Sequence, residues 1–233
     1  MTGRYEAHGF WGNRSESVQQ CAHRLVTFLT GLSGCDERFR CWYLKGWSKK
    51  AALRKPISYN DINHITAILQ SSISRREDTG TIIEELGFSF GMWNGLDDDD
   101  GVSIIGSIGM FTKVGILNTV QIELPKELRG LGDVSRMADA LQILATSWSP
   151  EWAMISSAQS IRLRDFRHSN GVFVDWMLYL DAGKYPLPVL PSFCQVRNIN
   201  NQGVIIVVQD EPVNAYNSEH VEKANAVKEA LAY

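Results

Sequence analysis

The chain has 233 residues, of which 44% are hydrophobic and 21% are charged, and its formal charge is −3. These values exclude disordered and fibrous proteins, and a chain of this length can bury roughly 70% of its extended surface without disulfides or a structural metal. We therefore expect one globular domain over residues 1–233.

The four cysteines, Cys21, Cys35, Cys41 and Cys194, form no Cys-x-x-Cys pair. The first residues show no basic segment followed by an apolar run of signal-peptide length. The longest aliphatic run, residues 204–208, is far shorter than the roughly 20 residues that cross a bilayer. We expect a cytoplasmic protein with reduced thiols and no membrane partner.

Helical spacing dominates the first third of the chain. After Ser15 and Ser17, which can cap a helix, apolar residues recur every three or four positions, and the pattern predicts a helix that stops at Gly31 and Gly34. We expect a second short helix over residues 36–45 and a third from Asp61 to about residue 75.

Alternation of apolar and smaller residues replaces the helical pattern from Gly87 onward. Three consecutive strands with short turns are predicted, ending at Asn94, starting at Val102 and covering residues 116–124. A helix over 133–148, strands over 152–156, 172–180, 193–199 and 204–209, and a last helix from residue 218 follow. The chain is therefore expected to be α+β, with a mostly antiparallel sheet flanked by helices at both ends of the chain.

Catalytic templates are missing from the sequence. It contains no Asp-x-Lys or Glu-x-Lys, no phosphate-binding glycine loop and no paired histidines. We predict no catalytic residues, no cofactor and no metal. A cluster of polar residues surrounds His168 in the sequence, with Arg162, Arg164, Asp165 and Arg167 nearby. An enzyme of unrecognised class is therefore an alternative.

Seven tryptophans are many for this length, and most of them lie in or beside amphipathic segments. Core or rim packing is the expected role for such residues. Trp47 and Trp93 stand next to glycine turns and are the expected exceptions.

Charge is segregated along the chain. Residues 77–112 contain no Lys, Arg or His but eight carboxylates, including Glu84, Glu85 and the run Asp97, Asp98, Asp99 and Asp100. Seven cations without an intervening acid fall between Arg38 and Lys55. Four consecutive aspartates disfavour strands and helices, so they belong in an exposed loop. That loop either mimics nucleic acid and steers a basic partner, or serves as a solubilising hairpin partly neutralised by the cations.

Short motifs follow one another along nearly the whole chain. They are Phe10-Trp11-Gly12-Asn13-Arg14, Gly87-Phe88-Ser89-Phe90, Trp148-x-Pro150-Glu151-Trp152, Trp176-Met177-Leu178-Tyr179-Leu180 and Asn217-Ser218-Glu219-His220-Val221. In order and spacing they resemble the immunity protein 52 family of bacterial polymorphic-toxin systems.

This resemblance implies a protein that binds and neutralises a cognate secreted toxin. It further implies that the toxin is a nuclease-type type VI secretion effector with a restriction-endonuclease-like fold, and that the protein has no direct nucleic-acid partner. Our expected partner-binding residues are Asp97, Asp98, Asp99, Asp100, Glu84, Glu85, Trp93 and Trp47. A secretion-system adaptor is a further alternative, which the sequence does not separate from an immunity protein.

Overall fold

A computed structural model of the chain describes residues 4–112, 118–164 and 171–231. The chain divides into two compact units. The N-terminal unit is Phe10–Ile122, and the C-terminal unit combines Met1–Gly9 with Glu123–Tyr233. The expected single domain over residues 1–233 stays a prediction.

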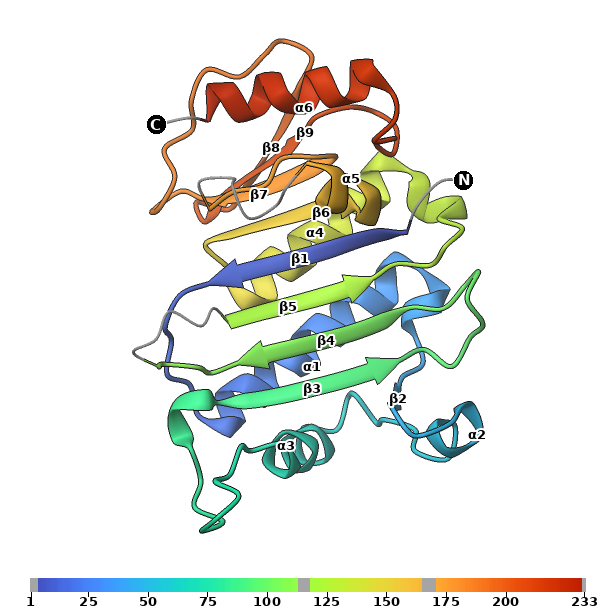
Figure 1. Cartoon of the computed structure of the whole chain (residues 1–233), viewed down its shortest axis with the longest axis vertical. Coiled ribbons are helices and arrows are strands. Elements are labelled where there is room, and N and C mark those ends of the chain that lie inside the picture. The colour runs from blue at the N-terminus through green and yellow to red at the C-terminus, as the bar shows by residue number, and fades with distance from the viewer. Residues whose placement is uncertain (1–3, 113–117, 165–170, 232–233) are drawn as a thin grey trace. The chain divides into compact units, whose positions relative to one another are not determined.

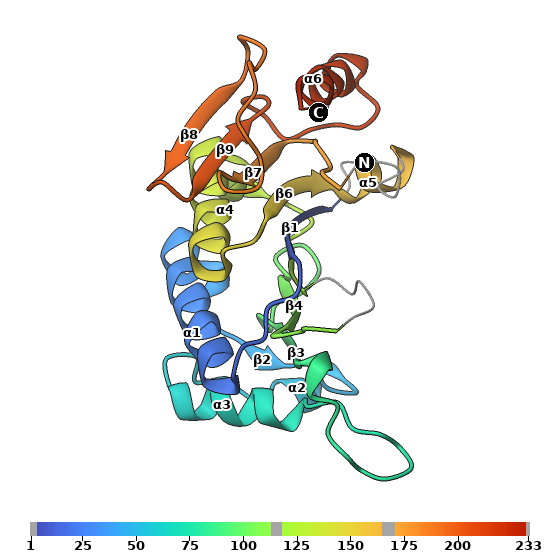
Figure 2. The ribbon, with the colours of Figure 1, turned by 90° about the vertical axis from the view of Figure 1, so that its left-hand side faces the viewer.

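The N-terminal unit contains a sheet with strand order β2-β3-β4-β5. Strand β3 is antiparallel to both β2 and β4. Helices α1 and α3 pack on each other, and α3 also contacts β3 (Figures 1 and 2). The elements are α1 (Val18–Cys35), β2 (Tyr43–Leu44), α2 (Lys49–Ala52), α3 (Ile62–Ser71), β3 (Phe88–Trp93), β4 (Ser103–Ile108) and β5 (Asn118–Glu123).

Helix α1 begins where the sequence predicts. The Ser17 side chain accepts from the Gln20 backbone N–H, and the Gln20 side chain accepts from the Ser17 N–H, which makes a capping box. Its buried face includes Leu25, Phe28 and Leu29. The expected stop at Gly31 and Gly34 is wrong by a few residues, because both glycines lie inside the last turns and the helix continues to Cys35.

The helix predicted over residues 36–45 is wrong. Only a 3₁₀ turn forms, at Glu37–Phe39, and strand β2 follows it. The Asp36 carboxylate accepts from the Arg38 backbone N–H and caps this short turn. Tyr43 and Leu44 then pair with Trp93 and Met92 of β3, so sheet pairing outweighs the weak helical pattern.

The C-terminal unit contains a second run of neighbouring strands, in the order β1-β6-β7-β9-β8. Strands β6, β7, β9 and β8 pair antiparallel. Helix α4 packs on β6, β7 and β9, and α5 contacts β6. The elements are β1 (Tyr5–Trp11), α4 (Val134–Trp148), β6 (Trp152–Ser157), α5 (Ala158–Leu163), β7 (Met177–Asp181), β8 (Gln195–Ile199), β9 (Gly203–Val207) and α6 (Ser218–Ala230).

The α+β class, the antiparallel strands and the helices near both ends are confirmed. Besides β2, the elements that the sequence did not predict include β1, whose buried and partly exposed residues alternate, and the short helices α2 and α5. The strand expected at 172–180 begins only at Met177. In the part of the chain that the structure describes, no helix is long and apolar enough to span a membrane.

The first recognised motif, around Trp11 and Arg14, has a structural role. The Trp11 side chain is buried at the end of β1. The Arg14 guanidinium lies 4.7 Å from the Trp11 ring centre, and its Nε donates to Glu16 at 3.1 Å. Arg24 of α1 donates to the same carboxylate at 2.6 Å. These contacts join the turn to the first helix.

Candidate functional site

The aspartate run lies in the loop between β3 and β4, within the N-terminal unit. We call residues 95–101 the acidic loop. Its four carboxylates are not equivalent, since the Asp97 side chain is 89% exposed whereas that of Asp100 is only 31% exposed. Asp98 and Asp99 are exposed like Asp97. The predicted anionic loop tip is therefore formed by the first three aspartates.

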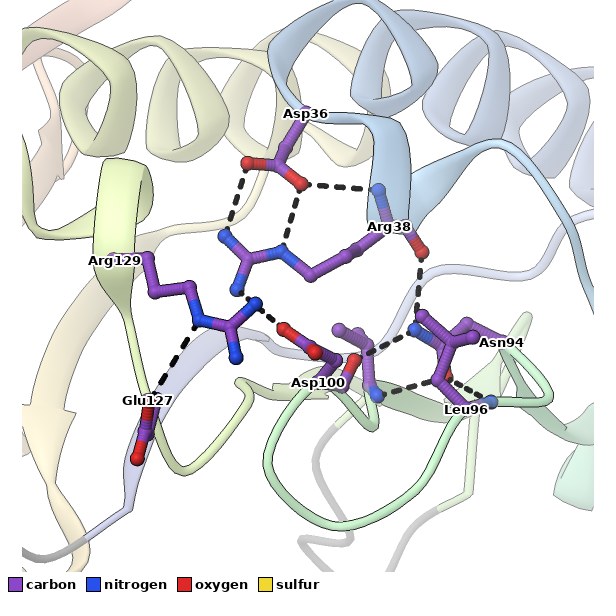
Figure 3. A network of polar contacts seen from close by, with 8 residues as sticks. Asp36, Arg38, Asn94, Leu96, Asp100, Glu127 and Arg129 are labelled. Atoms are coloured by element: carbon purple, nitrogen blue, oxygen red, sulfur yellow. Dashed lines mark hydrogen bonds and ion pairs between the residues drawn. The ribbon is translucent and has the colours of Figure 1, made fainter.

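Asn94, at the end of β3, fixes the conformation of the acidic loop (Figure 3). Its buried side-chain amide donates to the backbone oxygens of Arg38 and Asp100, at 3.2 and 2.9 Å. Its side-chain oxygen accepts from the backbone N–H groups of Leu96 and Val102, at 3.2 and 3.0 Å. One side chain thus makes four hydrogen bonds, two to the acidic loop and two to the backbone beside it, and these bonds hold the loop in place.

Arg38 anchors Asp100 of the acidic loop. The Arg38 guanidinium is buried and donates to both oxygens of Asp36, at 2.8 and 3.0 Å, and to Asp100 at 3.4 Å (Figure 3). The hydrogen bond to Asp36 raises the pKa of Arg38, against the opposing effect of burial. Asp100 therefore helps to hold the acidic loop in place. Arg38 neutralises part of the charge of the aspartate run, as one of the two interpretations of the sequence expected.

A second exposed segment, residues 45–55, contains five cations and no acid. We call it the basic arm. Its ends are closed by the bond from the Leu44 N–H to the Lys55 oxygen, 3.1 Å, and helix α2 within it is capped by Ser48. Figure 1 shows α2 beside β2. All five cations are exposed: Lys45, Lys49, Lys50, Arg54 and Lys55.

An open hollow of about 610 Å³ lies between the basic arm and the acidic loop. Trp93 and Ala52 line it together with residues of both segments, and Lys49 makes an ion pair with Asp97 across it. The Trp93 indole N–H donates to the Leu96 oxygen at 3.1 Å, which fixes the ring in the wall. Residues lining the hollow are Lys45, Gly46, Ser48, Lys49, Ala52, Trp93, Leu96, Asp97 and Asp98.

The two tryptophans singled out from the sequence do differ from the rest. Trp47 is fully exposed on the basic arm, and Trp93 is partly exposed in the wall of the hollow. The other five are buried in the core: Trp11, Trp42, Trp148, Trp152 and Trp176. Their expected role in packing is confirmed.

Glu84 and Glu85 lie apart from the hollow. They are exposed and precede β3, whereas the acidic loop follows it. A strand of six residues separates the two groups by roughly 16–20 Å. Glu84 borders a different hollow of about 320 Å³, together with Ser15, Glu16, Ile73, Phe88 and Phe111 among others. Their role in partner binding stays a prediction.

The alternative site around His168 falls mostly outside the described residues, since Asp165, Arg167 and His168 lie there. Arg164 donates to the Val174 oxygen at 2.8 Å and to the buried Asp175 carboxylate at 3.2 Å. Burial raises the pKa of Asp175, while the Ser157 N–H opposes the shift. Within residues 4–112, 118–164 and 171–231, no group of three or more His, Cys, Asp and Glu side chains could hold a metal ion.

Sequence comparison identifies the family. Residues 3–233 match immunity protein 52. The chain belongs to the immunity protein 52 family. A comparison with curated proteins gives no match.

Among solved structures, a Pseudomonas aeruginosa T6SS protein, PA0821, is similar to this chain. The TM-score is 0.53, the sequence identity 11%, and the match covers 98% of this chain and 73% of that chain. At this identity the likeness shows the fold alone.

Lys45, Lys49 and Asn94 are members of the site that the sequence did not single out. The two lysines stand in the predicted cation cluster, but their place beside the acidic loop depends on the pairing of β2 with β3. Asn94 precedes Gly95, and an Asn-Gly pair is typical of turns. This pair is the sequence feature that could have identified Asn94.

Proposed function

We propose that this protein binds and neutralises a cognate secreted toxin, without catalysis. Membership of the immunity protein 52 family over residues 3–233 is the observation that carries the proposal. The fold shared with a T6SS protein of P. aeruginosa supports a toxin delivered by type VI secretion. The protein would act in the cytoplasm as one domain, with no cofactor and no nucleic acid partner of its own.

The toxin is proposed to be a nuclease with a restriction-endonuclease-like fold. A nuclease binds a polyanion and therefore presents a basic surface. The exposed carboxylates Asp97, Asp98 and Asp99 form a negative tip on a loop that Asn94 holds in place. Such a fixed negative tip lowers the entropy cost of docking and speeds the approach of a basic partner. Glu84, Glu85, Trp93 and Trp47 are proposed to extend the contact surface.

Co-expression with the toxin encoded beside this gene tests the proposal. We expect restored growth of cells that carry the toxin, and purification of a stable complex of the two proteins. Nuclease activity of the isolated toxin on plasmid DNA, and its loss in the complex, tests the finer assignment. Growth arrest despite abundant immunity protein would contradict neutralisation.

Neutralising the acidic tip gives a sharper test of the surface. The double variant Asp98→Asn/Asp99→Asn removes two exposed charges and leaves Asp97 with Lys49 and Asp100 with Arg38. Exposed like charges contribute little stability, so the melting temperature should hold. We expect the association rate constant with the toxin to fall about tenfold at low salt and the difference to shrink as salt is added.

The matched control removes the same charge elsewhere. Glu222 and Glu229 are exposed on α6 in the C-terminal unit. The variant Glu222→Gln/Glu229→Gln should associate like the wild type. Equal rates for all three proteins would show that the acidic loop only confers solubility.

A further inference from the structure

We propose that the basic arm docks on an acidic patch of the toxin, with Trp47 as the anchor residue. The inference rests on the proposed function and deepens it. The toxin surface would then carry two neighbouring patches of opposite charge, a basic patch that faces the acidic loop and an acidic patch that faces the basic arm.

Charge complementarity is the first argument for an acidic occupant. The arm carries Lys45, Lys49, Lys50, Arg54 and Lys55 on eleven residues without one acid, and all five are exposed. Lys49 makes an ion pair with Asp97 of the neighbouring acidic loop. Like charges held close together repel one another, and an opposing group of carboxylates would relieve that repulsion.

Trp47 supplies the apolar contact between these charges. Its side chain is fully exposed, whereas Trp42 of the same segment is buried. Tryptophan is among the residues that most often dominate the free energy of an interface. Its position on the arm is defined, since Gly46 packs closely on α2: a Cβ there would lie 3.1 Å from the Ala52 nitrogen. The structure thus presents an aromatic ring on a hydrogen-bonded support.

The neighbouring acidic loop favours a protein partner over nucleic acid. Asp97 and Asp98 line the same hollow as Lys45 and Lys49. A continuous phosphate backbone laid on the arm would pass close to these carboxylates and be repelled by them. A folded protein can place acids opposite the arm and bases opposite the loop. The two signs also exclude a partner docked in the wrong orientation, which increases specificity.

Charge reversal with a matched control tests the arm. In the full chain, Lys45→Glu/Lys50→Glu changes the formal charge from −3 to −7, because each replacement changes it by −2. Arg162→Glu/Lys228→Glu makes the same change at exposed cations of the C-terminal unit. With the purified adjacent toxin as probe, we expect the arm variant to associate about tenfold more slowly at low salt and the control within about twofold of wild type.

Two further measurements keep the test independent of folding and net charge. Carbodiimide joins amines to carboxylates in direct contact, so mass spectrometry of the wild-type complex should find Lys45, Lys49 or Lys50 linked to toxin Asp or Glu residues. Trp47→Ala should raise the dissociation rate constant at least about tenfold while barely changing association. If Lys45→Glu/Lys50→Glu lowers the melting temperature, Lys45→Gln/Lys50→Gln replaces it. The association rate constant of this second variant is expected to lie between those of the wild type and the charge-reversal variant.

The outcomes separate this inference from the proposed function. A stable complex with no link through the arm, together with unchanged rates for the arm variants and Trp47→Ala, overturns the arm and leaves neutralisation standing. Absence of any complex with the toxin overturns both. Binding of wild type to a duplex oligonucleotide, lost in the arm variant while toxin binding is unchanged, would make the arm a nucleic-acid surface and overturn the inference.

Discussion

At the scale of single residues, Asn94 is the side chain on which the acidic loop depends most. Asn94→Ala removes the amide group that donates to the Arg38 and Asp100 oxygens and the single oxygen that accepts from the Leu96 and Val102 N–H groups. Buried backbone groups left without partners cost about 1–3 kcal/mol each, and some will reach water. We expect the free energy of unfolding to fall by about 3 kcal/mol, measured by urea denaturation.

The exposed Asn60 provides the comparison for that measurement. Asn60→Ala should change the free energy of unfolding by less than about 0.5 kcal/mol. If Asn94→Ala unfolds at the same urea concentration as Asn60→Ala, the loop does not depend on the amide network.

The cysteines give a second prediction at this scale. Cys21 is buried, and burial, followed by the charge of Glu16, raises its pKa to about 12. Cys41 is exposed. Because the thiolate is the reacting form, a brief treatment with iodoacetamide at about pH 8 should label Cys41 and leave Cys21 unmodified until urea is added. Early labelling of Cys21, read by mass spectrometry, would contradict the buried position.

The same raised pKa has a consequence for stability at alkaline pH. The unfolded thiol ionises near its ordinary value of 9.0, whereas the folded thiol holds its proton to about 12. The stability associated with Cys21 is therefore complete below pH 9.0 and is lost as the pH rises toward 12. Tyr5 and Tyr179, with pKa values raised from 10.0 to about 12 mainly by burial, act in the same direction from pH 10.0 upward.

Urea denaturation across this pH range measures the effect. The free energy of unfolding of the wild type should stay level from about pH 7 to 9 and then decline. In Tyr179→Phe the decline should be shallower above pH 10.0, since one of the three groups is missing. An unchanged slope would show that Tyr179 ionises in the folded state as easily as in the unfolded state.

At the scale of elements, Gly95 and Gly34 differ in whether their surroundings and backbone conformation would accept a side chain. Gly95 opens the acidic loop with φ +84°, and a Cβ there would lie 2.8 Å from the Tyr43 ring. Gly34 lies in α1, where a Cβ would meet nothing within 4 Å. We expect Gly95→Ala to destabilise by at least about 1–3 kcal/mol through strain, and Gly34→Ala to stabilise by up to about 0.5–1 kcal/mol. Thermal unfolding of the two variants checks both signs, and a stabilising Gly95→Ala would contradict the strained turn.

The elements also show what the sequence could predict. Helices α1, α3, α4 and α6 combine a helical repeat with a capping side chain, Ser17, Asp61, Asp133 and Asn217 respectively, so local signals agree. Residues 36–45 lack that agreement: Asp36 caps only a single turn, and Tyr43 and Leu44 find partners in β3, which lies about fifty residues further along the chain. Pairing over such a distance leaves no local signal.

The same reason limits prediction of the candidate site. The aspartate run and the exposure of Trp47 and Trp93 were predicted, since composition and neighbouring glycines carry that information. The approach of Lys49 to Asp97, 48 positions apart, depends on the pairing of β2 with β3. The sequence could therefore predict an acidic tip, but not the basic arm beside it or the different burial of Asp97 and Asp100.

At the scale of the whole molecule, the two compact units are not two continuous lengths of chain. The boundaries fall after Gly9 and after Ile122, and these positions lie inside β1 and β5. A unit cannot unfold alone without breaking strands that also supply residues to the other unit. Despite the two units, we therefore expect one cooperative unfolding transition.

Hydrogen exchange at increasing urea tests this expectation, because it reports each part of the chain separately. Peptides covering α1, in the N-terminal unit, and α4, in the C-terminal unit, should lose protection at the same urea concentration and with the same dependence on urea. Gly34→Ala, in α1, should then shift the transition of the α4 peptides as much as that of the α1 peptides, because a stabilised unit stabilises the whole cooperative structure. A shift confined to α1 would show that the units unfold independently, and the prediction of a single domain over residues 1–233 would be wrong.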